Sequence, residues 1–250
     1  KESLRLFESY NDQQNVPKVL FNIGLMHKVL GDYVRAEMMY QEALDAWSSG
    51  GNLAWTANLL NNLGVLQQLR GDYEKAASNF ERAIEYARIS NSPKSESVSL
   101  TSLGDLYKDL DAFPESLDVY RQAESIAKQT NDKFLLLYLG IAEGILNRIS
   151  GDFAKAEVAF EKVRDQATES QSIHDLNQIE SEMALYYLRL GKYEEAFAAA
   201  KKAYDNFQAE GNQSEALRAA FSCSMALSVI GDKDEALVYL EKVLPALLEN

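Results

Sequence analysis

The sequence predicts an all-α fold in which six helix-turn-helix units stack into an α-solenoid, preceded by a partial helix at the N-terminus. Three observations lead to this fold class. A glycine-containing turn motif, Gly31-Asp32-Tyr33, returns 40 residues later as Gly71-Asp72-Tyr73, and a fixed period of about 20–50 residues is typical of stacked repeats. Apolar residues on both sides of each copy recur at the i, i+3, i+4 and i+7 spacing of one helical face. No segment shows the alternating pattern of a strand.

The turn motif has a physical reason at its first two positions. Glycine is expected to end the first helix of a unit, because it adopts the left-handed conformation of a helix C-terminus without steric cost. Aspartate is expected to cap the second helix by accepting hydrogen bonds from its free backbone N–H groups. Further copies, two of them weaker, are Gly151-Asp152-Phe153, Gly191-Lys192-Tyr193, Asp111-Ala112-Phe113 and Gly231-Asp232-Lys233.

The elements follow in the order helix, tight turn, helix and loop. Residues 1–11 are predicted to be the tail of a second helix from a truncated preceding unit, because residues 1–10 align with residues 41–50. In the last unit Pro245 is expected to kink or stop the final helix, and the apolar residues around it indicate an internal piece of a larger protein. The six units are expected to form a single superhelix over residues 1–250, with approximate bounds 12–51, 52–91, 92–131, 132–171, 172–211 and 212–250.

Small and large residues alternate on the predicted inner faces of each unit. In the second unit Leu60, Leu63 and Gly64 share one face of the first helix. The matching face of the second helix carries Tyr73, Ala76, Phe80, Ala83 and Ile84. A small residue lets a neighbouring backbone approach closely, and an aromatic ring fills the space beside it, as a dense interior requires. These positions are therefore the predicted core.

The composition argues against several classes of function. The net charge is −13 and Lys and Arg form no cluster, which argues against nucleic acid as a partner of this chain. The longest apolar run, residues 134–142, is shorter than the roughly 20 residues that span a bilayer. Cys223 is the only cysteine, so no intrachain disulfide is expected, which fits a cytoplasmic location. No nucleotide-binding, metal-ligating or nucleophile–base motif appears, so we expect no cofactor, no metal and no catalysis.

The pattern Leu100-x2-Leu103-Gly104-x2-Tyr107, followed by Ser116-x3-Tyr120, resembles the consensus of the tetratricopeptide repeat (TPR) family. Residues 60–80 and Ala156-x3-Phe160 resemble it as well. The consensus period is about 34 residues, whereas this chain repeats every 40 residues. Units of this longer kind are similar to those in the regulatory regions of MalT-like bacterial transcription activators, in kinesin light chains and in spindle-orientation adaptors.

This resemblance implies a right-handed superhelix whose first helices line a concave groove that binds a protein, a peptide or a small effector. Counting about 100° per residue around each first helix places the groove opposite the core positions. The expected groove residues are Lys18, Phe21, Asn22, Asn58, Asn61, Asn62, Lys108, Tyr138, Arg148, Arg218 and Phe221.

Different groove residues imply different parts of a ligand. Asn22 and Asn62 share a position that peptide-binding TPR units often fill with asparagine, because a carboxamide both donates to and accepts from a peptide backbone. The alternative is that both are ordinary solvated asparagines. The groove cations are expected to receive acidic groups, and its aromatic residues suit an amphipathic peptide. Phe21 and Leu25 replace the carboxylate clamp of chaperone-binding TPR proteins, so a chaperone C-terminal tail is not expected.

The resemblance therefore favours a non-catalytic interaction or sensor module, as the regulatory region of a larger bacterial signal-transduction or transcription regulator. One alternative is a peptide-binding adaptor similar to kinesin light chains or spindle-orientation proteins. Another is a domain that senses a small effector. Apolar residues such as Leu240 and Leu244 on the last helix also indicate possible self-association through the terminal helices.

Overall fold

The computed structural model describes residues 15–49 and 51–248 of the chain. The partial helix predicted at residues 1–11 lies outside the described residues. Over the described ranges the chain is all-α, with twelve helices, tight connections and no strand. The helices are α2 (Val16–Val29), α3 (Tyr33–Ser49), α4 (Leu53–Leu69), α5 (Tyr73–Ile89), α6 (Pro93–Asp109), α7 (Phe113–Thr130), α8 (Lys133–Ile149), α9 (Phe153–Glu169), α10 (Ile173–Leu190), α11 (Tyr193–Glu210), α12 (Gln213–Ile230) and α13 (Lys233–Leu248).

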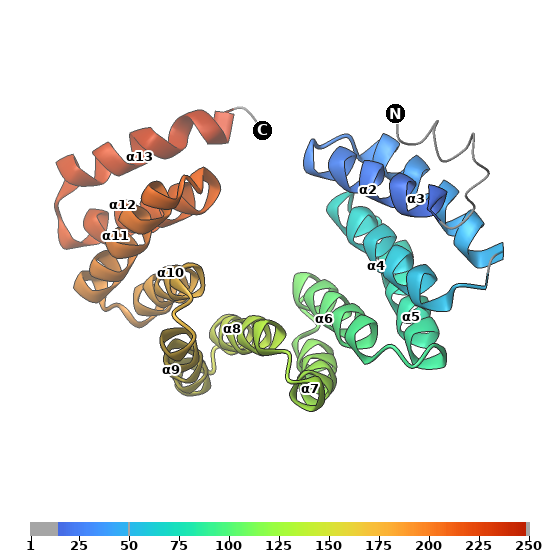
Figure 1. Cartoon of the computed structure of the whole chain (residues 1–250). Coiled ribbons are helices and arrows are strands. Elements are labelled where there is room, and N and C mark those ends of the chain that lie inside the picture. Colours follow the sequence, from blue (N-terminus) through green and yellow to red (C-terminus); the bar gives the residue numbers. More distant parts are fainter. Residues whose placement is uncertain (1–14, 50, 249–250) are drawn as a thin grey trace. The chain divides into compact units, whose positions relative to one another are not determined.

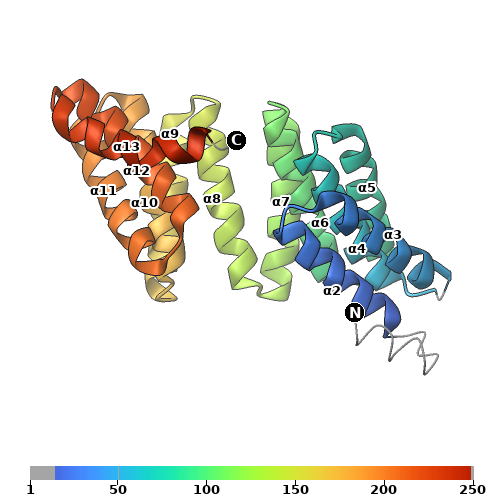
Figure 2. The same ribbon diagram turned by 90° about the horizontal axis from the view of Figure 1, so that it is seen from above.

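The chain divides into two compact units, Lys1–Leu139 (unit 1) and Gly140–Asn250 (unit 2). In unit 1 the first helices α2, α4 and α6 lie along one side and the second helices α3, α5 and α7 along the other (Figure 1). In unit 2, α10 packs on α11, and α12 packs on both α11 and α13 (Figure 2). The boundary falls within α8, and the single superhelix expected over the whole chain stays a prediction.

The turns between the two helices of a unit use the left-handed backbone conformation. Gly71 has a φ of +80°, and Asp111 takes φ +58° where the motif lacks glycine. The expectation that this position ends the first helix is confirmed. Capping is less uniform. The Asp152 carboxylate accepts from the backbone N–H of Lys155 at 3.3 Å, but Asp72 makes no such bond. The capping role expected for Asp32 is confirmed, because its carboxylate accepts from the backbone N–H of Arg35 at 3.3 Å. Asp72 departs from this pattern, and its carboxylate lies 3.8 Å from the Lys75 ammonium.

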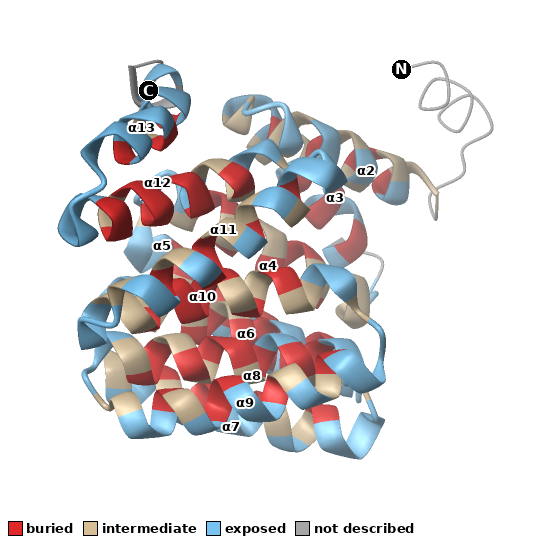
Figure 3. Ribbon diagram, turned by 90° about the vertical axis from the view of Figure 1, so that its left-hand side faces the viewer, coloured by how far each residue is buried: buried red, intermediate tan, exposed pale blue. Residues whose placement is uncertain are grey.

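The core is built on pairs of a glycine and an aromatic ring from the two helices of one unit. A Cβ atom at Gly64 would lie 2.5 Å from the ring of Phe80, and one at Gly144 would lie 2.5 Å from the ring of Phe160. Both rings have no exposed surface. Buried residues accordingly follow the helix faces that meet one another, and exposed residues cover the outer faces (Figure 3). Most of the core positions predicted in the repeat at 52–91 are buried: Leu60, Leu63, Gly64, Ala76, Phe80, Ala83 and Ile84. Tyr73 was expected on the same inner face, but it is 41% exposed, so that part of the core prediction is wrong.

The last helix differs from its expected form. Pro245 lies inside α13, which continues to Leu248. Of the two expected effects, a stop at this proline is wrong, and a kink stays a prediction. Proline has no backbone N–H, so one helix hydrogen bond is missing at this position. Only three residues of α13 follow Pro245, so this loss affects little of the helix. Leu240 is half-buried and Leu244 is 42% exposed, while the side chain of Leu248 lies outside the described residues.

Cys223 of α12 provides a test of the packing in unit 2. Its thiol is fully buried, and burial raises the pKa of the thiol to about 12. Because only the exposed thiolate reacts, we expect dithionitrobenzoate at pH about 8 to label the native chain at least about a hundredfold more slowly than the unfolded chain. The chain has one cysteine, so the absorbance change reports this site alone. Equal rates in buffer and in guanidinium would contradict the buried position.

Candidate functional site

The sequence-predicted groove residues all lie on first helices. We call the solvent-facing side of α2, α4 and α6 the first-helix face of unit 1, and that of α10 and α12 the first-helix face of unit 2. Helix α8 contributes Tyr138 to unit 1 and Arg148 to unit 2. The predicted residues come from α2, α4, α6, α8 and α12. None of them comes from α10, although that helix supplies a central carboxylate described below.

On α2 the predicted residues divide between surface and core. Lys18 and Asn22 are exposed, and the Lys18 ammonium lies 3.4 Å from the Asn15 side-chain oxygen. Phe21 instead packs inward. Its ring stacks on Tyr40 with centroids 5.7 Å apart, and its centroid lies 6.4 Å from those of Trp47 and Trp55. Phe21 therefore joins the aromatic core of unit 1.

The three asparagines of α4 have different environments. The Asn62 side chain donates to the backbone carbonyl of Asn58 at 2.9 Å, and both residues are half-buried. Asn61 is 8% exposed, and within the described part of the chain its side-chain oxygen has no hydrogen-bond partner. The Asn62 amide nitrogen therefore makes a contact within α4, whereas Asn61 is enclosed by the protein.

A carboxylate organises the first-helix face at α6. Asp105 accepts from the hydroxyl of Tyr120 at 2.6 Å and, through its other oxygen, from the hydroxyl of Tyr138 at 2.7 Å. The Lys108 ammonium lies 3.1 Å from the same carboxylate. Burial first, and the negative charge of Asp105 second, raise the pKa of both tyrosines. Both hydroxyls therefore stay protonated and continue to donate at neutral pH.

Sequence reasoning gave Asp105 no role. The equivalent positions in the other units, 40 residues apart, hold Leu25, Val65, Ile145, Leu185 and Met225. A single carboxylate at a position that is otherwise apolar was the signal in the sequence that could have pointed to Asp105. Asp105 also contributes to a small cavity of about 260 Å³ between α4 and α6, which is lined by Val65, Gln68, Leu69, Ser102, Asp105 and Asp109.

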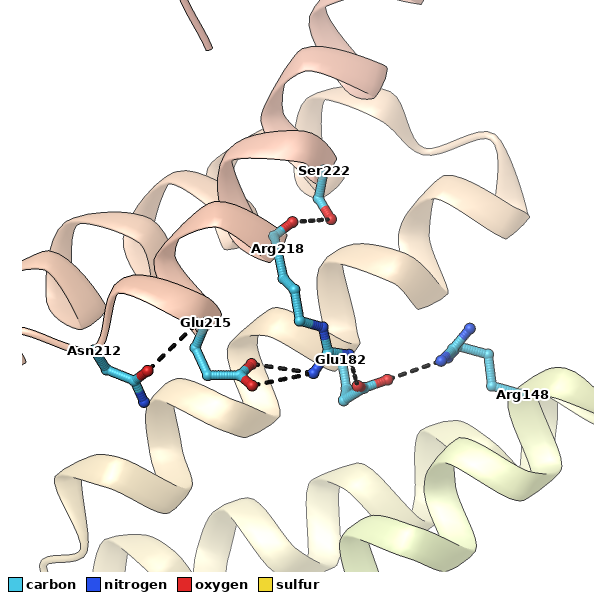
Figure 4. A network of polar contacts seen from close by, with 6 residues as sticks. All are labelled: Arg148, Glu182, Asn212, Glu215, Arg218 and Ser222. Atoms are coloured by element: carbon cyan, nitrogen blue, oxygen red, sulfur yellow. Dashed lines mark hydrogen bonds and ion pairs between the residues drawn. The ribbon is translucent and has the colours of Figure 1, made fainter. Parts of the chain in front are cut away.

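In unit 2 the first-helix face carries a chain of ion pairs (Figure 4). The Glu182 carboxylate of α10 lies 2.8 Å from the Arg148 guanidinium and 3.5 Å from that of Arg218. Arg218 also lies 3.1 Å from Glu215. The side chains of Arg148 and Glu182 are 11% and 6% exposed, whereas that of Arg218 is 56% exposed. Arg148 is thus a buried partner of Glu182, and Arg218, with the 43% exposed Phe221, faces solvent.

A second cavity lies on the opposite side of unit 1. Residues of α3, α4 and α5 line a space of about 580 Å³. Charges of both signs line it, with Glu37 and Asp45 on α3 and Lys75 and Arg82 on α5. Among the described residues, no group of three or more His, Cys, Asp or Glu side chains has a metal-binding arrangement. None of the described helices is long and apolar enough to cross a membrane.

The family of the chain follows from its sequence pattern. The Tetratricopeptide repeat family model matches residues 15–89 and 175–249, which together exceed half of the chain. The chain belongs to the tetratricopeptide repeat family. The resemblance carried by the Leu-Gly and Ala-aromatic patterns is confirmed, and so is the all-α helical-repeat fold of this TPR protein. A search of curated proteins gives no match.

Solved structures share the fold. The aspartyl phosphate phosphatase F of Bacillus subtilis has 13% identity and a TM-score of 0.75, over 92% of this chain and 59% of that one. A STAND signal-transduction ATPase with a TPR sensor, from Pyrococcus horikoshii, has 16% identity and a TM-score of 0.78, over 97% and 37%. A Rap protein complexed with competence and sporulation factor has 14% identity and a TM-score of 0.74, over 93% and 64%. The chain spans less than two thirds of each protein, and these identities show the fold alone.

Proposed function

We propose that this TPR chain is a non-catalytic sensor module that binds a peptide on the first-helix face of unit 1. We further propose that it serves as the regulatory region of a larger cytoplasmic signal-transduction or transcription regulator of bacteria. TPR folds are protein-interaction modules. Two of the similar structures support the regulatory context by their descriptions, a STAND protein with a TPR sensor and a Rap protein in complex with a signalling factor.

The observation that carries the peptide-binding proposal is the organised polar surface of unit 1. Tyr138 and Tyr120 hold Asp105 in one orientation, and a cavity opens beside it. Asn62 on the neighbouring helix is already oriented by its bond to Asn58. Groups held in place before binding lose little entropy when a ligand arrives, and a carboxamide matches the donor and acceptor of a peptide unit.

The test is a selection of heptapeptides displayed on phage against the whole chain, followed by anisotropy titrations with the labelled peptides. Replacing Asn22 and Asn62 together by alanine is expected to weaken a selected peptide by at least about tenfold, because two hydrogen bonds are lost. The matched control replaces Gln122 and Gln129, two exposed residues of the second helix α7, by alanine. Equal affinities for parent and asparagine variant would contradict the proposal, as would a loss confined to the glutamine variant.

A small-effector sensor is the second candidate, and the cavity between α3 and α5 favours it. Its volume of about 580 Å³ falls in the usual range of about 300–1,000 Å³ for ligand pockets. Its opposite charges would suit a small zwitterion. A ligand that binds only the folded state raises the melting temperature, so a panel of amino acids screened by thermal unfolding tests this candidate. An Arg82→Ala variant that shows the same shifts as the parent would exclude this cavity.

A further inference from the structure

We infer that the cavity between α4 and α6 receives a basic side chain, arginine or lysine, of the peptide ligand. This inference rests on the proposed peptide-binding function and names the kind of residue that the ligand must carry. It also reverses the expectation that groove cations such as Lys108 receive acidic groups.

The walls of the cavity match the two parts of a basic side chain. Val65 and Leu69 of α4 present aliphatic surface, and Asp105 and Asp109 of α6 present two carboxylates. Residues four apart on a helix lie on one face, so both carboxylates serve the same space. An arginine or lysine places its methylene groups on apolar surface and its charged head on polar groups. A volume of about 260 Å³ admits one such side chain.

The charges at the cavity are not balanced by the protein. Lys108 is paired with Asp105. Asp109 accepts a hydrogen bond from the neutral carboxamide of Gln68 at 2.7 Å, and within the described ranges it has no ion pair. Two carboxylates and one ammonium leave one negative charge in the cavity. An acidic ligand group approaching Lys108 would meet this excess charge, whereas a guanidinium or ammonium neutralises it.

The carboxylate of Asp105 is held ready for such a partner. Each of its oxygens accepts from a tyrosine hydroxyl, one from α7 and one from α8. The Lys108 ammonium also donates to one of these oxygens, at 3.1 Å. Since a carboxylate has about four acceptor positions, these three contacts leave one position for a further donor. Asp105 can therefore accept one hydrogen bond from a bound guanidinium while it keeps both tyrosine contacts.

The probe for this inference is a single residue, N-acetyl-arginine methylamide, added to the isotope-labelled whole chain and followed by amide shifts in NMR spectra. We expect saturable shifts around Val65, Leu69 and Asp109. The uncharged isostere, N-acetyl-citrulline methylamide, is expected to bind at least about tenfold more weakly, because the charge-assisted bonds are lost. Equal binding of the two probes would overturn the inference.

Two variants and one control localise the effect. Asp109→Asn is expected to weaken the arginine probe at least about fivefold. Asp118→Asn, which makes the same charge change at an exposed position of α7, is expected to leave it unchanged. Ser102→Arg places a tethered guanidinium at the cavity and should abolish probe binding. Equal weakening by both asparagine variants, or an unaffected Ser102→Arg variant, would overturn the inference.

The experiments distinguish a failure of this inference from a failure of the proposed peptide-binding function. Selected peptides that bind the first-helix face without any basic residue would overturn this inference and leave the proposed function intact. Probe binding in the cavity without any selectable peptide would support the cavity assignment and count against the peptide-binding function.

Discussion

Replacing Phe80 by alanine is expected to lower the free energy of unfolding by about 3–5 kcal/mol. The ring has no exposed surface, and it rests against Gly64 at a distance that leaves no space for a Cβ atom. Because Gly64 has no side chain, nothing on that side can move into the space that the ring leaves. The cost therefore includes both the lost burial and an unfilled cavity. Urea unfolding followed by circular dichroism measures it.

Phe134→Ala is the matched control for this loss. Phe134 is the same residue type and also lies in unit 1, but it is 75% exposed. We therefore expect its replacement to change the free energy of unfolding by at most about 0.5 kcal/mol. A loss below about 1 kcal/mol for Phe80→Ala, or similar losses for the two variants, would show that the glycine–aromatic pair does not hold the unit together.

Glu182→Leu is the second substitution with a large expected effect, a loss of about 3 kcal/mol or more. Glu182 balances the charge of Arg148, and both side chains are largely enclosed. Removing the carboxylate leaves a buried guanidinium without its counterion, and in a low-dielectric interior that charge is costly. Urea unfolding of the whole chain, followed by circular dichroism, measures the loss. The reactivity of Cys223, which lies in unit 2, reports the unfolding of that unit.

A double variant separates charge balance from packing. Arg148→Met combined with Glu182→Leu removes both charges and is expected to recover most of the stability, because an apolar pair replaces a buried ion pair at little cost. Glu215→Gln breaks only the exposed contact of Arg218 and is expected to cost at most about 1 kcal/mol. If the double variant were no more stable than Glu182→Leu alone, the charge-balance argument would be wrong.

Much of the fold followed from the sequence because its signals are local. The left-handed turn at Gly71 needs only a residue that tolerates positive φ. The pairing of Gly64 with Phe80 joins residues of one helical hairpin. Each of these features depends only on residues within one 40-residue repeat, so the repeating pattern of the sequence is enough to predict it. The effect of Pro245 was predicted less well, because it depends on how many residues of the helix follow the proline.

The candidate site was harder to predict because its side chains contact residues of the next repeat along the chain. Counting residues around an isolated helix placed Phe21 with Asn22 in the groove, but the ring of Phe21 packs against Trp55 on the first helix of the next repeat. The contact between Arg148 and Glu182 likewise joins two successive repeats within unit 2. Helical periodicity contains no information on which side chain of the following unit lies opposite, so these partners appear only in the folded chain.

The closure of each glycine–aromatic pair within its own hairpin has a consequence for the history of the chain. Gly64 and Phe80, or Gly144 and Phe160, remain together whatever precedes or follows their hairpin. A gene segment that encodes 40 residues can therefore be duplicated or deleted without separating either partner from the other. Related chains of different length can arise by whole-hairpin steps, while the contacts between successive hairpins diverge to suit new ligands.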